Sequence, residues 1–256
     1  MTAAIIVLSA LALLTFLVRG AIGAGSSIVF NAAFLAVFAL GMTADLELRD
    51  GLYWLALANA VGAVVMLATL RKTLVLEPIT VRYLIGTVPT TILFSILLTR
   101  VEGGWLAIVL AIVIVLAGTN MILRRKLAPA PMITLERWAP VFGVGAGALA
   151  GLYGMGGPIG LLLFNRAEGD PTDFRMRLTI VTSIISFVRF GSIASQGVFD
   201  TERLLVAAGT LPAVGIGLVL GFWAHRFIKP APFKLALGLL VTLSGLLTLV
   251  QQTLLS

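Results

Sequence analysis

Two short stretches decide the fold: LVRGAIGAGSSI at residues 17–28 and ALAGLYGMGGPI at residues 148–159. Both follow the pattern Gly-x-x-Gly-x-Gly, two small residues and Ile, and they lie 131 positions apart. Downstream, GTVP at residues 86–89 matches GTLP at residues 209–212, at a separation of 123 positions. Two matches in the same order and at similar separations predict that the chain contains an internal duplication.

The sequence around these stretches is strongly apolar. Of its 256 residues 59% are hydrophobic and only 11% are charged, whereas soluble domains carry about 25% charged residues. Long apolar runs recur along the chain, which is the pattern of membrane-spanning helices. We therefore predict an all-α polytopic membrane protein, with apolar segments at residues 3–18, 26–41, 52–70, 83–99, 105–123, 138–150, 155–165, 178–197, 204–224 and 233–250.

Basic loops predict the orientation of the duplicated halves. Cations gather around residues 71–82, 124–137 and 225–234, and the positive-inside bias assigns all three loops to the cytoplasm. Residues 3–41 and 138–165 must then form hairpins that open to opposite faces.

The predicted architecture is one integral membrane domain made of two inverted repeats, residues 1–126 and 127–256, with 8–10 membrane segments in all. Each repeat is a broken-helix hairpin plus three spans. The hairpins are either re-entrant or pairs of short spans. The alternative architecture, eight plain spans in parallel repeats, places one strongly basic loop outside.

The residue inventory argues against most other chemistry. The chain has no cysteine and one histidine, His225, too few for a His- or Cys-based metal site. It lacks a Walker motif, and all eleven acidic residues fall in or beside loops. We therefore expect no enzyme activity and no cofactor. We also expect no nucleic-acid partner, because the net charge of +7 is explained by the basic loops that set the topology.

Two arginines lie where no carboxylate is nearby. Arg189 is well inside segment 178–197, and Arg19 borders the first glycine break. A guanidinium at the centre of a membrane helix costs at least ~2.5–3.5 kcal/mol, and a bound anion would compensate it through the planar guanidinium fork. The alternative is that the side chain snorkels to the membrane surface or binds helix carbonyls, and it weighs more for Arg19.

The glycine breaks provide the second part of the predicted site. Backbone N–H groups freed at a break cannot be left in lipid, and a helix that restarts there favours an anion. Alternatively the glycines only let helices pack closely, the role expected for Gly143, Gly145 and Gly147. The predicted substrate-binding residues are Arg19, Gly23, Gly25, Ser26, Ser27, Asn59, Gly154, Gly156, Gly157, Ser183, Ser186 and Arg189.

These residues resemble the sulfite exporter TauE/SafE family. The resemblance is carried by the duplicated glycine elements, by Arg175-Met-Arg177-Leu-Thr179 at the start of a span and by the late Arg189, and it covers essentially the whole chain. The first copy departs from the usual glycine run at Ser26-Ser27, which puts the substrate preference in doubt. The resemblance implies a secondary transporter of the bacterial inner membrane that exports sulfite, an organosulfonate or a related sulfur-containing organic anion.

The residues by themselves indicate only a site suited to a small anion. The expected partners are that anion and the lipid bilayer, and a homodimer is compatible with the sequence. An uptake permease for another organic anion, an anion channel and a non-transporting membrane scaffold remain as alternatives. An inside-negative potential favours anion efflux by roughly 2.3 kcal/mol per charge per 100 mV.

Overall fold

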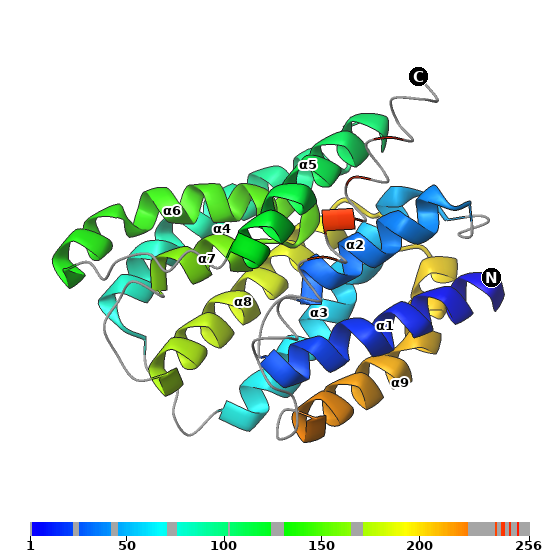
Figure 1. The fold of residues 1–256 in the computed structure, drawn as a ribbon. Helices are drawn as coiled ribbons and strands as arrows, with labels where there is room; N and C mark the ends of the chain where they lie inside the picture. The colour runs from blue at the N-terminus through cyan, green and yellow to red at the C-terminus, as the bar shows by residue number, and fades with distance from the viewer. Residues whose placement is uncertain are drawn as a thin grey trace. The chain divides into compact units, whose positions relative to one another are not determined.

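The computed structural model describes residues 2–22, 26–41, 46–70, 76–101, 103–123, 131–164 and 171–224, together with five single positions between 239 and 250. Every regular element in these ranges is an α-helix (Figure 1), which confirms the predicted fold class. The predicted segment 233–250 lies largely outside the described residues. The helices are α1 (Thr2–Ile22), α2 (Ser26–Ala39), α3 (Leu48–Leu70), α4 (Pro78–Leu98), α5 (Gly103–Leu123), α6 (Met132–Tyr153), α7 (Gly157–Phe164), α8 (Pro171–Ala194) and α9 (Thr201–Ala224).

Length and surface chemistry of these helices suit a membrane. Five described helices are long and apolar enough to cross one, over Ala4–Ala21, Leu48–Ala68, Pro78–Leu98, Met176–Ala194 and Thr201–Ala224. Large apolar side chains such as Ile85, Leu116 and Val219 are exposed, as lipid-facing residues are. Trp105 and Trp223 are exposed near helix ends, where aromatic side chains meet the membrane–water boundary.

The first arm of each hairpin is longer than the apolar pattern predicted. The runs 3–18 and 138–150 become helices of 21 residues (α1) and 22 residues (α6). Arg19 had marked the end of the first run, yet it continues α1 as a buried side chain. The short arms are α2, with 14 residues, and α7, with 8 residues.

Packing divides the chain into two compact units. Unit 1 comprises Met1–Leu55, Arg100–Arg125 and Phe199–Ser256, and unit 2 comprises Ala56–Thr99 and Lys126–Val198. Neither unit coincides with a predicted half of the chain. Each unit instead joins the hairpin of one half to a long helix of the other half, while the inverted duplication itself stays a prediction.

In unit 1 the main contact runs between α1 and α9, which lie side by side in Figure 1. The backbones touch at glycines: a Cβ atom added to Gly20 would lie 2.6 Å from the carbonyl oxygen of Leu218. A Cβ atom on Gly221 would collide with the carbonyl oxygen of Leu17. Larger residues at these points would force the two helices apart.

In unit 2 the corresponding contact runs between α4 and α6. A Cβ atom on Gly147 would lie 2.5 Å from the carbonyl oxygen of Thr87, and one on Gly143 would collide with that of Tyr83. The packing role expected for Gly143 and Gly147 is therefore confirmed. Buried side chains from α4, α6, α7 and α8 complete the core: Ile79, Tyr83, Leu135, Ala139, Ala146, Ala150, Leu163, Phe164, Leu178, Val181 and Ile185.

Repeat-related positions make the same kind of crossing in each unit. Gly20 and Gly151 occupy matching places in the two quoted stretches. Gly151 abuts Ser95 of α4, and Gly20 abuts Leu218 of α9. Ser95 and Leu218 are themselves 123 positions apart, the separation of the GTVP and GTLP motifs. The correspondence supports the predicted duplication.

We expect Gly221→Ala to destabilise the protein, because the added methyl group would overpack the α1–α9 crossing at a cost of about 1–3 kcal/mol. The matched control is Gly215→Ala in the same helix, where a Cβ atom meets no described atom within 4 Å. Thermal unfolding of both variants in detergent measures the difference. Equal melting temperatures for the two variants would contradict this account of the crossing.

We expect single cysteines to report the inverted topology cleanly, because the chain has no cysteine of its own. In intact cells a membrane-impermeant maleimide should label Gln196→Cys and Arg100→Cys. It should label Leu76→Cys and Ile133→Cys only after the membrane is permeabilised. Labelling of Ile133→Cys in intact cells would favour the parallel alternative.

Candidate anion site

The helix break in unit 2 is built around Gly154. This residue ends α6 with φ of 70°, a left-handed conformation that suits glycine. Its N–H donates to the carbonyl of Ala150 at 2.8 Å, and the N–H of Met155 donates to that of Leu149 at 3.1 Å. The chain restarts as α7 at Gly157, with Pro158 in the first turn, where its missing N–H costs no helix hydrogen bond. These bonds leave the carbonyls of Gly151 and Leu152, near the end of α6, for other donors.

Arg189 of α8 provides those donors. Its Nε donates to the carbonyl oxygen of Gly151 and its Nη2 to that of Leu152, both at 3.2 Å. The residue is 2% exposed, so it does not snorkel to the surface. The observed contact is the carbonyl-binding alternative weighed above, and it compensates part of the charge because the carboxyl end of a helix is partly negative.

One nitrogen of the same guanidinium remains uncommitted. Nη1 of Arg189 is buried and has no hydrogen-bond partner among the described residues. The ion pairs of the described residues do not include Arg189. A buried unpaired donor of a charged group costs free energy, so this nitrogen is suited to an anionic ligand.

Tyr83 of α4 holds the other side of the break. Its hydroxyl lies 3.5 Å from the carbonyl oxygen of Gly156, a weak hydrogen bond. A Cβ atom on Gly160 would lie 3.2 Å from the same hydroxyl, and the Tyr83 ring packs on Phe164. Sequence reasoning missed this residue, although a tyrosine in an otherwise apolar span one turn before Thr87 was a usable signal.

Hydroxyl side chains of α4 and α8 are buried in the same unit. Ser183 and Ser186, two of the predicted residues, precede Arg189 on α8. Ser186 donates to the carbonyl of Thr182 at 2.7 Å, whereas the buried Ser183 hydroxyl has no partner among the described residues. Thr91 and Ser95 of α4 border Gly151 and likewise have unpartnered hydroxyls in the described structure; the sequence did not single them out.

Three predicted residues differ in what surrounds them. Asn59 is buried in the part of α3 that belongs to unit 2. A Cβ atom on Gly156 would lie 3.0 Å from the Cβ of Ala150, so a side chain there would crowd α6. A Cβ atom on Gly157 would meet no described atom within 4 Å, so none of the described residues covers the first turn of α7 at this point.

The first break belongs to unit 1. Gly23 and Gly25 lie outside the described residues. Ser26 and Ser27 are buried in the first turn of α2, and Arg19 is buried near the end of α1 with its guanidinium carbon 5.8 Å from the Phe16 ring centre. Convergence of the two breaks on one site stays a prediction.

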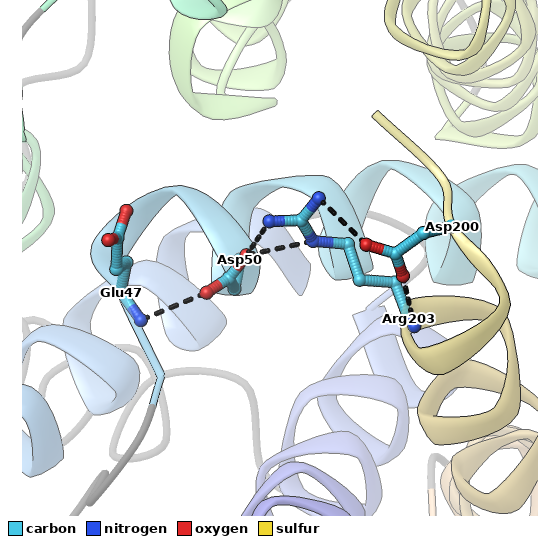
Figure 2. A network of polar contacts seen from close by, with 4 residues as sticks. All are labelled: Glu47, Asp50, Asp200 and Arg203. Atoms are coloured by element: carbon cyan, nitrogen blue, oxygen red, sulfur yellow. Dashed lines mark hydrogen bonds and ion pairs between the residues drawn. The ribbon is translucent and has the colours of Figure 1, made fainter. Parts of the chain in front are cut away.

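A pocket of about 190 Å³ in unit 1 is unsuited to an anion. It lies among the starts of α1, α3 and α9, and its charged lining residues are Asp50, Asp200, Glu202 and Arg203. Figure 2 shows Arg203 held between Asp50, at 2.9 Å, and Asp200, at 3.4 Å. Three carboxylates against one guanidinium leave negative charge there.

Comparison with known proteins is consistent with this chemistry. The family model described as "Sulfite exporter TauE/SafE" matches residues 8–248. The chain is also similar to a protein of Cupriavidus necator described as "Probable sulfite/organosulfonate exporter TauE". The two are 28% identical over 249 residues, which cover 89% of this chain and 91% of that relative. No solved structure matches the chain.

We expect Gly154→Ala to lower stability by about 1–2 kcal/mol, because a left-handed conformation costs a residue with a Cβ atom that much. Gly157→Ala is the matched control at the same break, since its Cβ atom would enter open space. Thermal unfolding of the two variants checks this expectation. An unchanged melting temperature in Gly154→Ala would show that the break does not need its glycine.

Proposed function

The chain belongs to the sulfite exporter TauE/SafE family, and from that premise we propose that it is a secondary transporter exporting sulfite or a related sulfur-containing organic anion. It is a multi-pass bacterial membrane protein, in the inner membrane as is typical of the family, and it is a transporter rather than an enzyme.

The observation that carries the proposal is the buried guanidinium of Arg189. Two of its nitrogens donate hydrogen bonds to carbonyls near the carboxyl end of α6, and Nη1 has no partner among the described residues. In this proposal Nη1 binds the substrate. Acidic residues with described side chains lie before or near the starts of helices, not at helix centres. A cation carrier generally uses carboxylates inside the membrane, whereas an anion needs the arrangement found here.

The break supplies further donors for the substrate. No described residue covers Gly157 at the first turn of α7, and the start of a helix favours negative charge through its first N–H groups and its dipole. In this proposal an oxygen of the substrate accepts from Nη1, while the start of α7 and the Ser183 hydroxyl contact its other oxygens. Alternating access then exposes the loaded site to one side of the membrane at a time.

The name of the Cupriavidus necator relative supports the substrate, since it specifies sulfite and organosulfonates for that protein. Export is the favoured direction because the membrane potential drives a negative solute outward by roughly 2.3 kcal/mol per charge per 100 mV.

We expect Arg189→Gln to abolish sulfite counterflow in proteoliposomes, or to reduce it at least about 30-fold, because removing a buried charged partner costs 2–5 kcal/mol. Arg189→Lys keeps the charge but not both carbonyl bonds, so it should retain a small part of the activity. Arg100 is exposed just after the end of α4, so the Arg100→Gln variant should transport sulfite as the original protein does.

The same preparations discriminate among the alternatives. Sulfite should raise the melting temperature of the original protein and of Arg100→Gln but not that of Arg189→Gln. Conductance without counterflow would indicate a channel. Stabilisation by cations alone, or an unaltered sulfite response in Arg189→Gln, would overturn the proposal.

A further inference from the structure

We propose that Arg177 is a second oxyanion-binding residue, at which an arriving anion takes the place of the carboxylate of Glu77. The inference rests on the proposed function, since the anion that arrives is the transported one. It concerns a different arginine, and it makes a different prediction from that for Arg189. Arg189 lies twelve residues further along α8, about 18 Å at the rise of an α-helix, so one small anion cannot bind both.

Arg177 is a buried cation whose donors are only partly used. Its side chain is 7% exposed, and Nη2 lies 2.7 Å from Oε2 of Glu77. Its Nε is buried and has no hydrogen-bond partner within the described ranges. Nε and Nη2 form the edge of the guanidinium that fits two oxygens of one oxyanion. The carboxylate of Glu77 therefore occupies half of that edge.

Glu77 can leave more easily than Arg177 can do without an anion. Its side chain is 31% exposed, so water can solvate the carboxylate once the pair opens. Glu77 precedes α4 in the N-cap position, but its side chain makes no capping hydrogen bond. The helix start therefore does not hold the carboxylate in place. Arg177 stays buried and needs a negative partner, which the substrate can supply with two oxygens instead of one.

A second ion pair in unit 2 shows what an ordinary surface contact looks like here. Arg82 of α4 lies 3.2 Å from Glu136 of α6, with side chains 49% and 21% exposed. Both ion pairs join the start of α4 to the start of another helix. Solvent reaches the Arg82 guanidinium, so no anion is required when that pair opens. Glu136 is therefore the matched control for Glu77.

The position of the pair gives the exchange a role. Arg177 and Glu77 lie at the helix starts that the basic loops assign to the cytoplasm. An exported anion would meet Arg177 before it reaches Arg189. Exchange of the resident carboxylate lets the anion lose its hydration without leaving a buried charge unpaired at any stage. The ligand class is a small oxyanion with two oxygens free on one face, such as sulfite or a sulfonate.

The test uses the full chain in zwitterionic lipid, in nanodiscs for binding and thermal unfolding and in proteoliposomes for counterflow, with sulfite as the probe. Glu77→Gln removes the competing carboxylate, so the affinity for sulfite should rise and the KM of counterflow should fall, each about fivefold. That factor corresponds to the free energy of a partly exposed ion pair. Sulfite should also raise the melting temperature of Glu77→Gln more than that of the original protein. Arg177→Gln should weaken binding, Arg177→Lys should lie between, and Glu136→Gln should change nothing.

If the ion pair between Arg177 and Glu77 is only structural, Glu77→Gln does not raise the affinity for sulfite. In that case Glu77→Gln and Arg177→Gln weaken binding alike, or neither changes it, and the proposal is overturned. If Arg177→Gln does not fold, the direction of change in Glu77→Gln and Arg177→Lys decides. Binding that is lost in Arg189→Gln but unaltered in Glu77→Gln removes this inference alone. Absence of sulfite binding in the original protein removes the proposed function and this inference with it.

Discussion

The hydrogen bonds from Arg189 to the last carbonyls of α6 are the interaction on which the candidate site of unit 2 depends. A helix that ends among buried residues leaves carbonyl groups that water cannot reach. A buried guanidinium has the complementary requirement, because it needs acceptors. Here the two requirements meet at Gly151 and Leu152, and each makes the other tolerable. In the proposed site the contact has a second role, because it leaves Nη1 of Arg189 without a described partner close to the break.

A buried cation with only some of its hydrogen-bond donors free is appropriate for a carrier. A carboxylate beside Arg189 would cancel its charge, and a guanidinium with every donor free would hold an oxyanion through several strong bonds. Two neutral carbonyls take up part of the hydrogen-bonding capacity and leave the charge in place. The cargo is then attracted into the membrane without being bound too tightly for release.

The sequence predicted the kind of helices better than their partners. Nine of the ten predicted apolar segments correspond to described helices, and the glycine pattern located the break at Gly154, because both signals depend on neighbouring residues. The length of α1 was underestimated because Arg19 was counted as the end of an apolar run, although a buried arginine can continue a helix. The pairing of α1 with α9 is a tertiary contact, and hydropathy carries no information on which helix a glycine face will meet.

The same limit explains the site. Arg189 could be predicted because an isolated arginine in an apolar span is costly wherever the span packs. Its partners are the backbone carbonyls of Gly151 and Leu152. Every residue has such a carbonyl, so the sequence does not indicate which ones Arg189 will contact. Thr91 and Ser95 could not be selected from the sequence, because a hydroxyl in a span usually bonds a carbonyl of its own helix. Only the packing of α4 against Gly151 brings them to the site.

The pairing of α1 with α9 has a consequence for biogenesis. Gly20 is synthesised early, but Leu218, its backbone neighbour, emerges only after nearly the whole chain has been translated. At ordinary rates of synthesis, 5–20 residues per second, this interval is about 10–40 seconds. During that time α1 waits in the bilayer with its glycine face against lipid or an insertion factor, whereas α4 and α6 can already join. Among the described helices, the last long one to be synthesised therefore packs against the first.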